Sequence, residues 1–115
     1  MINNLLMQTP INQVNDKGNR EGYWESYYPN GSLHYKGCYK DGVHDGYWEN
    51  YFDNGNLNSK GSYKDGQEDG YWKFNHYNGN PWCEGPYKNG NEIGLWVYYS
   101  SNYGVKDIEF YANIN

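Results

Sequence analysis

The chain has 115 residues, a net charge of −5 and a mean hydropathy of −1.15. It holds 15 tyrosines and 5 tryptophans but few aliphatic residues, which argues against a closed aliphatic core and favours an extended sheet held by aromatic contacts. An acidic chain gains nothing from counterion release at phosphates, so the charge argues against binding of nucleic acid or of anionic membrane surfaces.

The first segment, residues 1–17, is interpreted as an N-terminal cap or partial repeat. Its start, MINNLLMQTP, has no positively charged region and too short an apolar run for a signal peptide. No stretch of the sequence approaches the length of a transmembrane segment. Cys38 and Cys83 occupy positions that do not correspond between repeats, so we expect free thiols. These features together predict a cytoplasmic protein.

From residue 18 onward the sequence repeats with a period of 24 residues. Tryptophan recurs in phase as Trp24, Trp48, Trp72 and Trp96. The repeat units are 18–41, 42–65, 66–89 and 90–113. We therefore expect a single repeat domain that spans residues 1–115.

Each unit is predicted to form a β-hairpin. In the first unit YWESYY and SLHYKGCY, both rich in aromatic strand formers, flank the turn sequence PNG. Asn30-Gly31 predicts a two-residue type I′ turn, because both residues tolerate a positive φ. No segment after residue 10 has a helical period. The sequence thus predicts an all-β fold, an elongated and twisted antiparallel β-meander of tandem hairpins.

The predicted turn fixes which residues lie opposite each other. The pairs are, unit by unit, Glu25 with Lys36, Glu49 with Lys60, Lys73 with Glu84, and Val97 with Ile108. The charges exchange signs together in the third unit, which indicates that they are cross-strand partners on one face of the sheet.

The same register divides every hairpin into two faces. The Trp face carries Trp24, Tyr28, Leu33, Tyr35 and their equivalents, and the charged face carries Tyr23, Glu25, Tyr27, His34, Lys36, Cys38 and theirs. We expect the core on the Trp face, where each of the first three tryptophans covers the glycine opposite it, as Trp24 covers Gly37. In the fourth unit Trp96 lies opposite Glu109 instead. The charged face is expected to be mostly solvated.

The repeat YKGCYKDGVHDGYW at 35–48 resembles the MORN repeat (membrane occupation and recognition nexus). The element W-x-x-Y-[YF]-x-N-G-x-L at 24–33 and 48–57, with the period of 24, is similar to its bacterial and viral variant. The resemblance implies an elongated sheet of hairpins that contacts other proteins. Some relatives carry an antitoxin label, and the wider family is linked to membranes and phosphoinositides.

The sequence predicts no catalytic residue, no metal site and no cofactor. His34, His44 and His76 belong to different units and share no metal-ligand spacing with the cysteines. Cys38 and His34 share a face but lie about 13 Å apart along a strand, which is too far for a hydrogen bond. The loops DGVHD and DGQED lack the dense oxygen ligands of a calcium loop and fit turn chemistry better.

The predicted partner-binding residues lie on the charged face. The fourth unit supplies an apolar patch of Leu95, Val97, Tyr99, Ile108 and Phe110, and the tyrosines Tyr23, Tyr27, Tyr47 and Tyr51 extend the face. Exposed apolar patches mark interaction sites. The sequence leaves open whether another protein, a second copy or residues 1–10 cover this patch.

These observations predict a non-enzymatic protein–protein interaction module. A specific version is an acidic inhibitor or antitoxin-like protein that covers a basic partner surface, for which electrostatic complementarity speeds association. The alternative is an aromatic ladder that binds carbohydrate or a cationic small ligand. The first version predicts a salt-dependent association rate, and the alternative predicts a change in tryptophan fluorescence on ligand addition.

Overall fold

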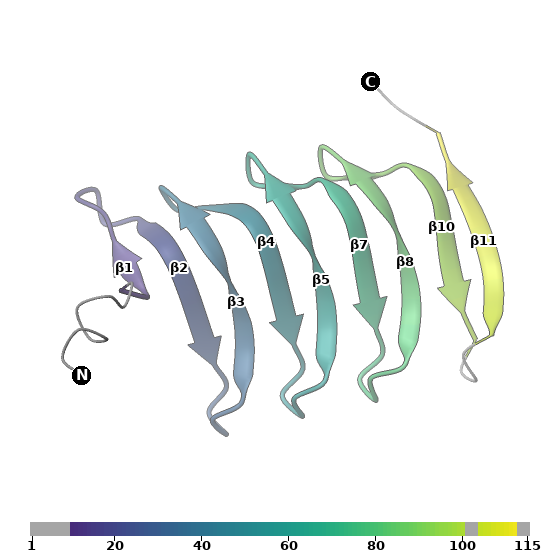
Figure 1. Ribbon diagram of the computed structural model, residues 1–115, viewed down its shortest axis with the longest axis horizontal. Coiled ribbons are helices and arrows are strands. Elements are labelled where there is room, and N and C mark those ends of the chain that lie inside the picture. Colours follow the sequence, from purple (N-terminus) through teal and green to yellow (C-terminus); the bar gives the residue numbers. More distant parts are fainter. Residues whose placement is uncertain (1–9, 101–103, 113–115) are drawn as a thin grey trace, which may run out of the picture.

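The computed structural model describes residues 10–100 and 104–112, and within these ranges it contains strands and turns but no helix. The strands are β1 (Gln13–Val14), β2 (Arg20–Tyr27), β3 (Leu33–Lys40), β4 (Val43–Tyr51), β5 (Leu57–Lys64), β6 (Gln67–Glu68), β7 (Gly70–Asn75), β8 (Pro81–Lys88), β9 (Asn91–Glu92), β10 (Gly94–Tyr99) and β11 (Val105–Tyr111). They form one open antiparallel sheet in the order β1-β2-β3-β4-β5-β7-β8-β10-β11, with β6 paired to β5 and β9 to β8 (Figure 1). The predicted all-β meander of tandem hairpins is confirmed.

The hairpin loops differ from the predicted type I′ turns. In the first hairpin three residues, 29–31, separate Tyr28 from Ser32, and the Tyr28 N–H donates to the Ser32 carbonyl at 2.8 Å. Within this loop only Gly31 has a positive φ, of 89°. Asn30 acts through its side chain, because its Oδ1 accepts the Ser32 N–H at 2.9 Å. The loop is therefore a type I turn closed by a left-handed glycine.

A β-bulge restores the predicted register one step further along the hairpin. The pairing shifts between Ser26 and Tyr27, so that His34 has no partner across β2. Because the loop is one residue longer than predicted and the bulge removes one residue from the ladder, the two differences cancel. All four predicted pairs are confirmed, namely Glu25 with Lys36, Glu49 with Lys60, Lys73 with Glu84, and Val97 with Ile108.

The bulge also exchanges two residues between the faces. Leu33 pairs with Tyr27, which lies on the charged face. His34 stacks on Tyr28, with 4.2 Å between the ring centroids, and meets the edge of Tyr35. The expected positions of Leu33 on the Trp face and His34 on the charged face are therefore wrong, because a bulge reverses the alternation of side chains.

True two-residue turns join one hairpin to the next. Asp41-Gly42, with φ values of 51° and 83°, connects Lys40 to its partner Val43. Asp65-Gly66 and Asn89-Gly90 repeat this conformation. Both central residues have a positive φ, as a type I′ turn requires. The meander is thus continuous, with a tight turn at each end of every long strand pair.

The core lies on the Trp face, as predicted, but the tryptophans cover different glycines. The indole of Trp48 lies on Gly37 of the preceding hairpin, where an added Cβ would sit 2.3 Å from the ring. Trp72 covers Gly61, and Trp96 covers Gly85, in the same way. The cause is a bulge of Gly46 and Tyr47 in β4, which brings Trp48 level with Gly37 across the link. Each tryptophan therefore joins two hairpins.

The tryptophan column is buried along most of its length. Trp48, Trp72 and Trp96 expose 1, 2 and 1% of their surface, and their Nε1 groups donate at 3.0 Å to the carbonyls of Cys38, Ser62 and Pro86. Trp24 begins the column half-buried. The expected pairing of Trp96 with Glu109 is confirmed. Because Glu109 stands where earlier hairpins have a glycine, it offers no flat site for a further indole.

Candidate functional site

One row of side chains on the charged face crosses the sheet from β2 to β11. Successive paired residues in this row are Glu25, Lys36, Glu49, Lys60, Lys73, Glu84, Val97 and Ile108. The row contains every residue of the four predicted pairs, because these residues are also paired between neighbouring hairpins, as Lys36 is with Glu49. It begins with alternating charges and ends in apolar side chains.

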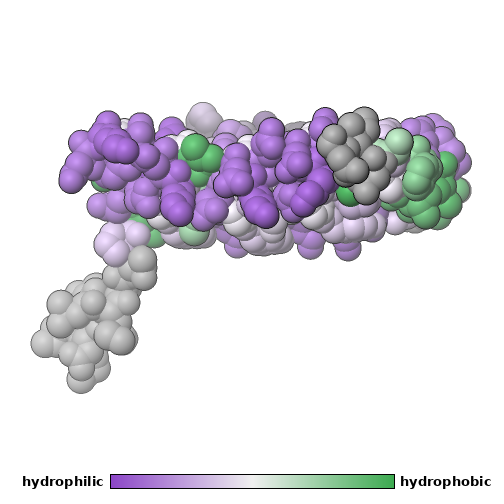
Figure 2. Space-filling view, turned by 90° about the horizontal axis from the view of Figure 1, so that it is seen from above, coloured by the Kyte–Doolittle hydropathy of each residue, from purple (hydrophilic) through white to green (hydrophobic). Residues whose placement is uncertain are grey.

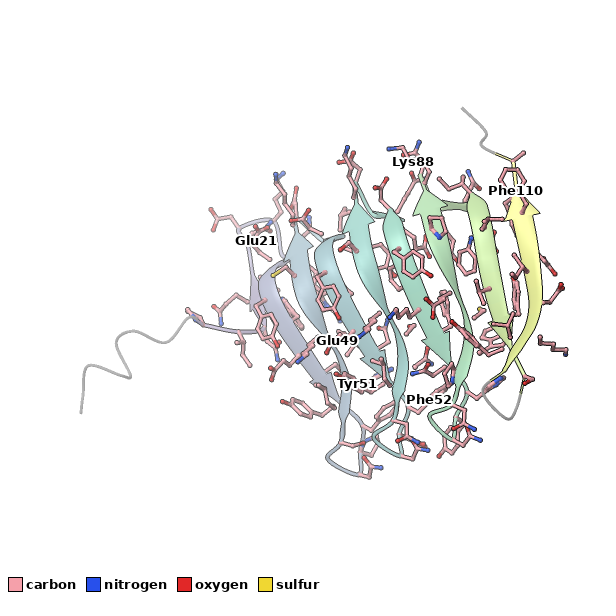
Figure 3. The ribbon with its side chains drawn as sticks, turned by 45° about the vertical axis from the view of Figure 1, so that its right-hand side comes forward. Glu21, Glu49, Tyr51, Phe52, Lys88 and Phe110 are labelled. Carbon is pink, nitrogen blue, oxygen red and sulfur yellow. The ribbon has the colours of Figure 1, made fainter. Side chains whose placement is uncertain are left out.

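Each glutamate of the row is clamped by two tyrosine hydroxyls. Tyr23 and Tyr27 donate to Glu25, Tyr47 and Tyr51 to Glu49, and Tyr71 and Tyr99 to Glu84, at donor–acceptor distances between 2.5 and 2.9 Å. Glu49 and Tyr51 lie side by side on this face in Figure 3. The five tyrosines predicted to bind a partner therefore already use their hydroxyls within the sheet.

These tyrosine–glutamate hydrogen bonds, which we call clamps, favour a neutral tyrosine and an ionised glutamate. Burial, followed by the hydrogen bond to Glu49, raises the pKa of Tyr47 and of Tyr51 to about 12. The hydrogen bond from Tyr51, with smaller contributions from Tyr47 and Lys36, holds the pKa of Glu49 below its ordinary value. At neutral pH an ionised carboxylate thus accepts from two neutral hydroxyls, which makes the bonds charge-assisted.

The lysines of the row have unequal surroundings. The Lys36 Nζ lies 3.4 Å from the Glu49 Oε1 and links the first two hairpins. Lys60 and Lys73 lie directly opposite each other in β5 and β7. Neither of them forms an ion pair with any residue that the structure describes. The sign exchange in the third unit thus places Lys73 opposite Glu84 in its own hairpin, without an ion pair between them, and opposite a second lysine in the neighbouring hairpin.

The apolar end of the row is exposed. We name Leu95, Val97, Ile108 and Phe110 the end patch; Leu95 pairs with Phe110, and Val97 with Ile108. Leu95, Ile108 and Phe110 expose 59, 57 and 72% of their surface. Figure 2 shows apolar residues gathered at the β11 end of the molecule, and Figure 3 places Phe110 there. The alternative that residues 1–10 cover this patch concerns a segment of which all but Pro10 lies outside the described residues.

A hollow lies beside Trp82, the one tryptophan that does not follow the 24-residue period. Trp82 is 46% exposed, and it lines an open hollow of about 600 Å³ together with Tyr98, Asp107 and Glu109. Its ring lies 6.0 Å from that of His76. The sequence shows that Trp82 does not follow the 24-residue period, but the hollow itself could not be derived from the period.

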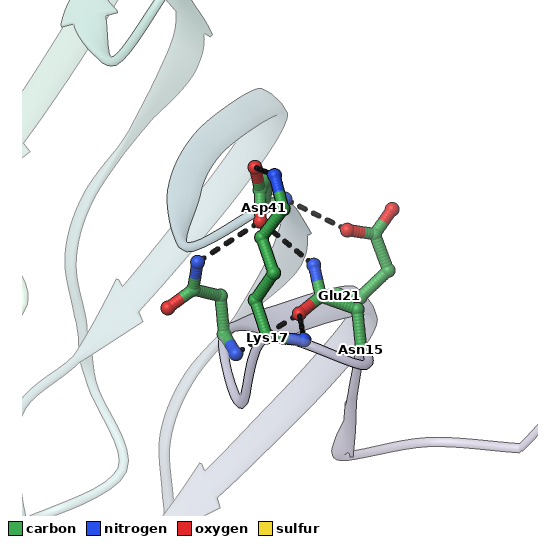
Figure 4. Close-up of polar contacts among 5 residues, drawn as sticks. Asn15, Lys17, Glu21 and Asp41 are labelled. Atoms are coloured by element: carbon green, nitrogen blue, oxygen red, sulfur yellow. Dashed lines mark hydrogen bonds and ion pairs between the residues drawn. The ribbon is translucent and has the colours of Figure 1, made fainter.

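Asp41, in the Asp41-Gly42 turn between β3 and β4, has a structural role. The Asp41 carboxylate accepts from the Asn15 Nδ2 at 2.7 Å, from the Asn19 Nδ2 at 3.0 Å and from the Lys17 Nζ at 3.2 Å (Figure 4). These hydrogen bonds, that from Asn19 foremost, lower the pKa of Asp41 to about 2. The carboxylate thereby fastens the residues before β2 to the link. Within residues 10–100 and 104–112, no group of three or more His, Cys, Asp or Glu residues is placed to hold a metal.

Two features of the charged face, the tyrosine clamps and the pairing of Lys60 with Lys73, were not predicted, although the sequence contains a signal for each. A tyrosine stands two positions before and two after both Glu25 and Glu49, which is the pattern that produces the clamps. The contact of Lys60 with Lys73 follows if the pairing is continued across the link and not only within each hairpin.

The comparison with known proteins agrees with this architecture. No described helix could span a membrane. No curated protein matches the chain. The pattern of the MORN repeat variant matches residues 20–41, 45–65 and 68–89, which together make up more than half of the sequence. MORN repeats are interaction modules, typically without enzymatic activity. The chain therefore belongs to the MORN repeat variant family.

Proposed function

We propose that this protein binds another protein through the end patch and the adjoining charged face, without catalysing a reaction. The observation that carries the proposal is the exposure of Leu95, Ile108 and Phe110 together on a face that is elsewhere charged. Clustered apolar side chains of this kind are costly in water unless a partner covers them. The patch thus supplies the apolar centre of an interface, and the charged row supplies a polar margin.

The open strand β11 supports the same site. It is the last strand in the sheet order, so one row of its backbone groups faces away from β10. Exposed edges of this kind accept a strand from a partner. Glu109 occupies the position on which a further tryptophan would lie, which favours a different protein over another repeat unit stacked in the same manner.

A narrower form of the proposal is an inhibitor or antitoxin-like protein that covers a basic surface. The net charge of −5 supports it, because opposite charges accelerate diffusional encounter. The association rate with the purified partner should then fall steeply as salt is raised. An association rate that is indifferent to ionic strength would exclude the acidic mechanism and leave the end patch as the binding determinant.

Affinity capture tests the site. Wild type is compared with Ile108→Glu and Phe110→Glu as bait in cells of the native host, and Gln67→Glu serves as a control with the same charge change at an exposed position. We expect one stoichiometric partner that the two patch variants lose and the control retains. If all four baits capture the same protein equally, the partner binds elsewhere on the sheet.

The exposed Trp82 supports a second candidate, a site for carbohydrate or a cationic small ligand. Trp48, Trp72 and Trp96 are buried, so such a ligand would contact Trp82 and the carboxylates of Asp107 and Glu109. Titration with soluble oligosaccharides and with choline should change tryptophan fluorescence, and Trp82→Ala should abolish the change. A fluorescence response that persists in Trp82→Ala would remove this candidate.

A further inference from the structure

The alternation of charge along the row fails at one point. Lys36 lies between Glu25 and Glu49, so each of its neighbours in the ladder is an anion. Lys60 lies between Glu49 and a second lysine, Lys73. Like charges directly opposite each other in a sheet are destabilising. The second and third hairpins therefore meet at an unfavourable pair.

The nearby carboxylates do not relieve this pair. Glu49 accepts two tyrosine hydroxyls and forms its ion pair with Lys36, at 3.4 Å. Glu84, on the other side, is held by two tyrosines. Lys60 is half-buried and Lys73 is exposed, and neither has an ion-pair partner among the described residues. Although the chain is acidic, the unpaired charge at the centre of this face is positive.

A feature that weakens the fold without a local compensation points to a role outside folding. We propose that Lys60 and Lys73 together bind one carboxylate side chain of the protein that docks on the end patch. This inference rests on the proposed function and specifies the chemistry of its partner. A carboxylate between the two ammonium groups would turn the repulsive pair into two attractive contacts.

A single carboxylate fits this position better than a phosphate. The two lysines are flanked in the row by the carboxylates of Glu49 and Glu84. A doubly charged phosphate is repelled by these neighbours more strongly than a singly charged carboxylate.

The position of the pair relative to the end patch constrains the partner. Lys73 and Val97 are two strands apart in the row, which corresponds to about 10 Å at the usual strand spacing. A polyproline II segment advances about 3.1 Å per residue and returns to the same face at every third residue. A partner segment in this conformation that crosses the sheet therefore presents an apolar residue to Val97 and, three residues away, an Asp or Glu to the lysines.

The test uses the captured partner and the full-length chain. Lys60→Gln and Lys73→Gln are compared with Lys64→Gln, which removes the same charge from an exposed position of the same strand β5, and with Ile108→Glu. Kd is measured by calorimetry, and Tm is measured on each free variant. We expect Lys60→Gln and Lys73→Gln to bind about tenfold more weakly while their Tm stays equal to or above that of wild type. Lys64→Gln should bind as wild type does.

The outcomes separate this inference from the proposed function. Loss of binding in Ile108→Glu with unchanged binding in both lysine variants would overturn the inference and leave the proposed function standing. Capture of no partner by wild type would overturn both. A fall in Tm in the lysine variants would show that the pair serves folding, against the inference. Competition by inorganic phosphate, but not by acetate at equal ionic strength, would replace the carboxylate by a phosphorylated group and overturn this assignment.

Discussion

The tyrosine hydroxyls of the charged face are bound to carboxylates and not to water alone. Glu49 shows the arrangement most fully, since Tyr47 and Tyr51 donate to its two oxygens at 2.8 and 2.5 Å. Hydrogen bonds to a charged group contribute more than neutral ones, although partial exposure reduces their worth. The tyrosines therefore stabilise the sheet by fixing its carboxylates, and the apolar edges of their rings remain available for contact.

Removal of one hydroxyl tests this role. Tyr51→Phe should lower the free energy of unfolding by about 1 kcal/mol, because Glu49 loses its shorter hydrogen bond. Tyr63→Phe is the matched control, since Tyr63 is half-buried in the same unit and its hydroxyl has no bond to a described residue. Urea unfolding measures both, and equal losses in the two variants would contradict the clamp.

Alkaline pH should unfold the protein in a defined window. Burial is the leading cause that raises the pKa of Tyr23, Tyr47, Tyr51 and Tyr71 to about 12. The unfolded-state pKa is about 10, so the stability from these groups is fully present below pH 10 and is lost as the pH rises through about 12. Tyrosinate absorbance and circular dichroism should change together above pH 10. If these tyrosines ionise gradually near pH 10 while the fold stays intact, their pKa is not raised by the folded sheet, and the prediction is wrong.

At the scale of the hairpin, the close packing of tryptophan on glycine sets the distance between repeats. Gly37, Gly61 and Gly85 leave space for an indole from the next hairpin, and a side chain at any of them would overlap the ring. The tryptophan then donates to the backbone of the hairpin that it covers. The tryptophan that recurs every 24 residues thus determines both the packing and the register between neighbouring hairpins.

Gly61→Ala should destabilise the fold by about 1–3 kcal/mol, the usual cost of overpacking. An alanine Cβ would lie 2.2 Å from the Trp72 ring, and the φ of Gly61 is not positive, so the cost arises from the ring and not from the backbone. Urea unfolding measures the loss of stability, and a red shift of tryptophan emission reports the displacement of the Trp72 ring. Ser62→Ala, at the adjacent position, should be nearly neutral, and a neutral Gly61→Ala would refute the packing.

The sequence predicted the hairpins, their register and the buried tryptophans, because a 24-residue period carries this information. It did not predict the conformation of the turns, because Asn30-Gly31 and Asn89-Gly90 share the same letters but differ in φ at the asparagine. The predicted pairs of Trp24 with Gly37, Trp48 with Gly61 and Trp72 with Gly85 are confirmed. The prediction that each indole covers the glycine of its own hairpin was wrong, because the bulge at Gly46 cannot be seen in the period.

Of the candidate site, the sequence located the apolar residues that form the exposed end patch. The tyrosine clamps of Glu25 and Glu49 had a signal in the tyrosines two positions before and after each glutamate. The third clamp could not be predicted in this way, because Tyr71 and Tyr99 reach Glu84 from two neighbouring strands.

At the scale of the molecule, the sheet has two different ends. Residues before β2 are fastened at one end by the contacts of Asp41, whereas β11 closes the other end with exposed apolar residues. Each hairpin contacts mainly its neighbours, as in other repeat proteins. Stability should therefore be local, and the end hairpin should open without the rest.

Trp96→Ala should test this independence. Loss of the buried indole is expected to remove amide protection from β10 and β11 while β2–β5 stay protected, because among the described strands the last hairpin has a neighbour on one side only. Trp48→Ala, in the middle of the column, should cost about 3–5 kcal/mol and lower protection across several hairpins. Equal loss of protection throughout the chain in Trp96→Ala would show a single cooperative unit.

Binding of a partner at the end patch is tested most directly by hydrogen exchange of the protein alone and in complex with its captured partner. If the end patch is the binding surface, exchange should slow in β10 and β11 and at Lys73 in β7, while β2 and β3 remain unchanged. Protection confined to β2 and β3, or to the hollow beside Trp82, with β11 unaltered, would contradict the claim.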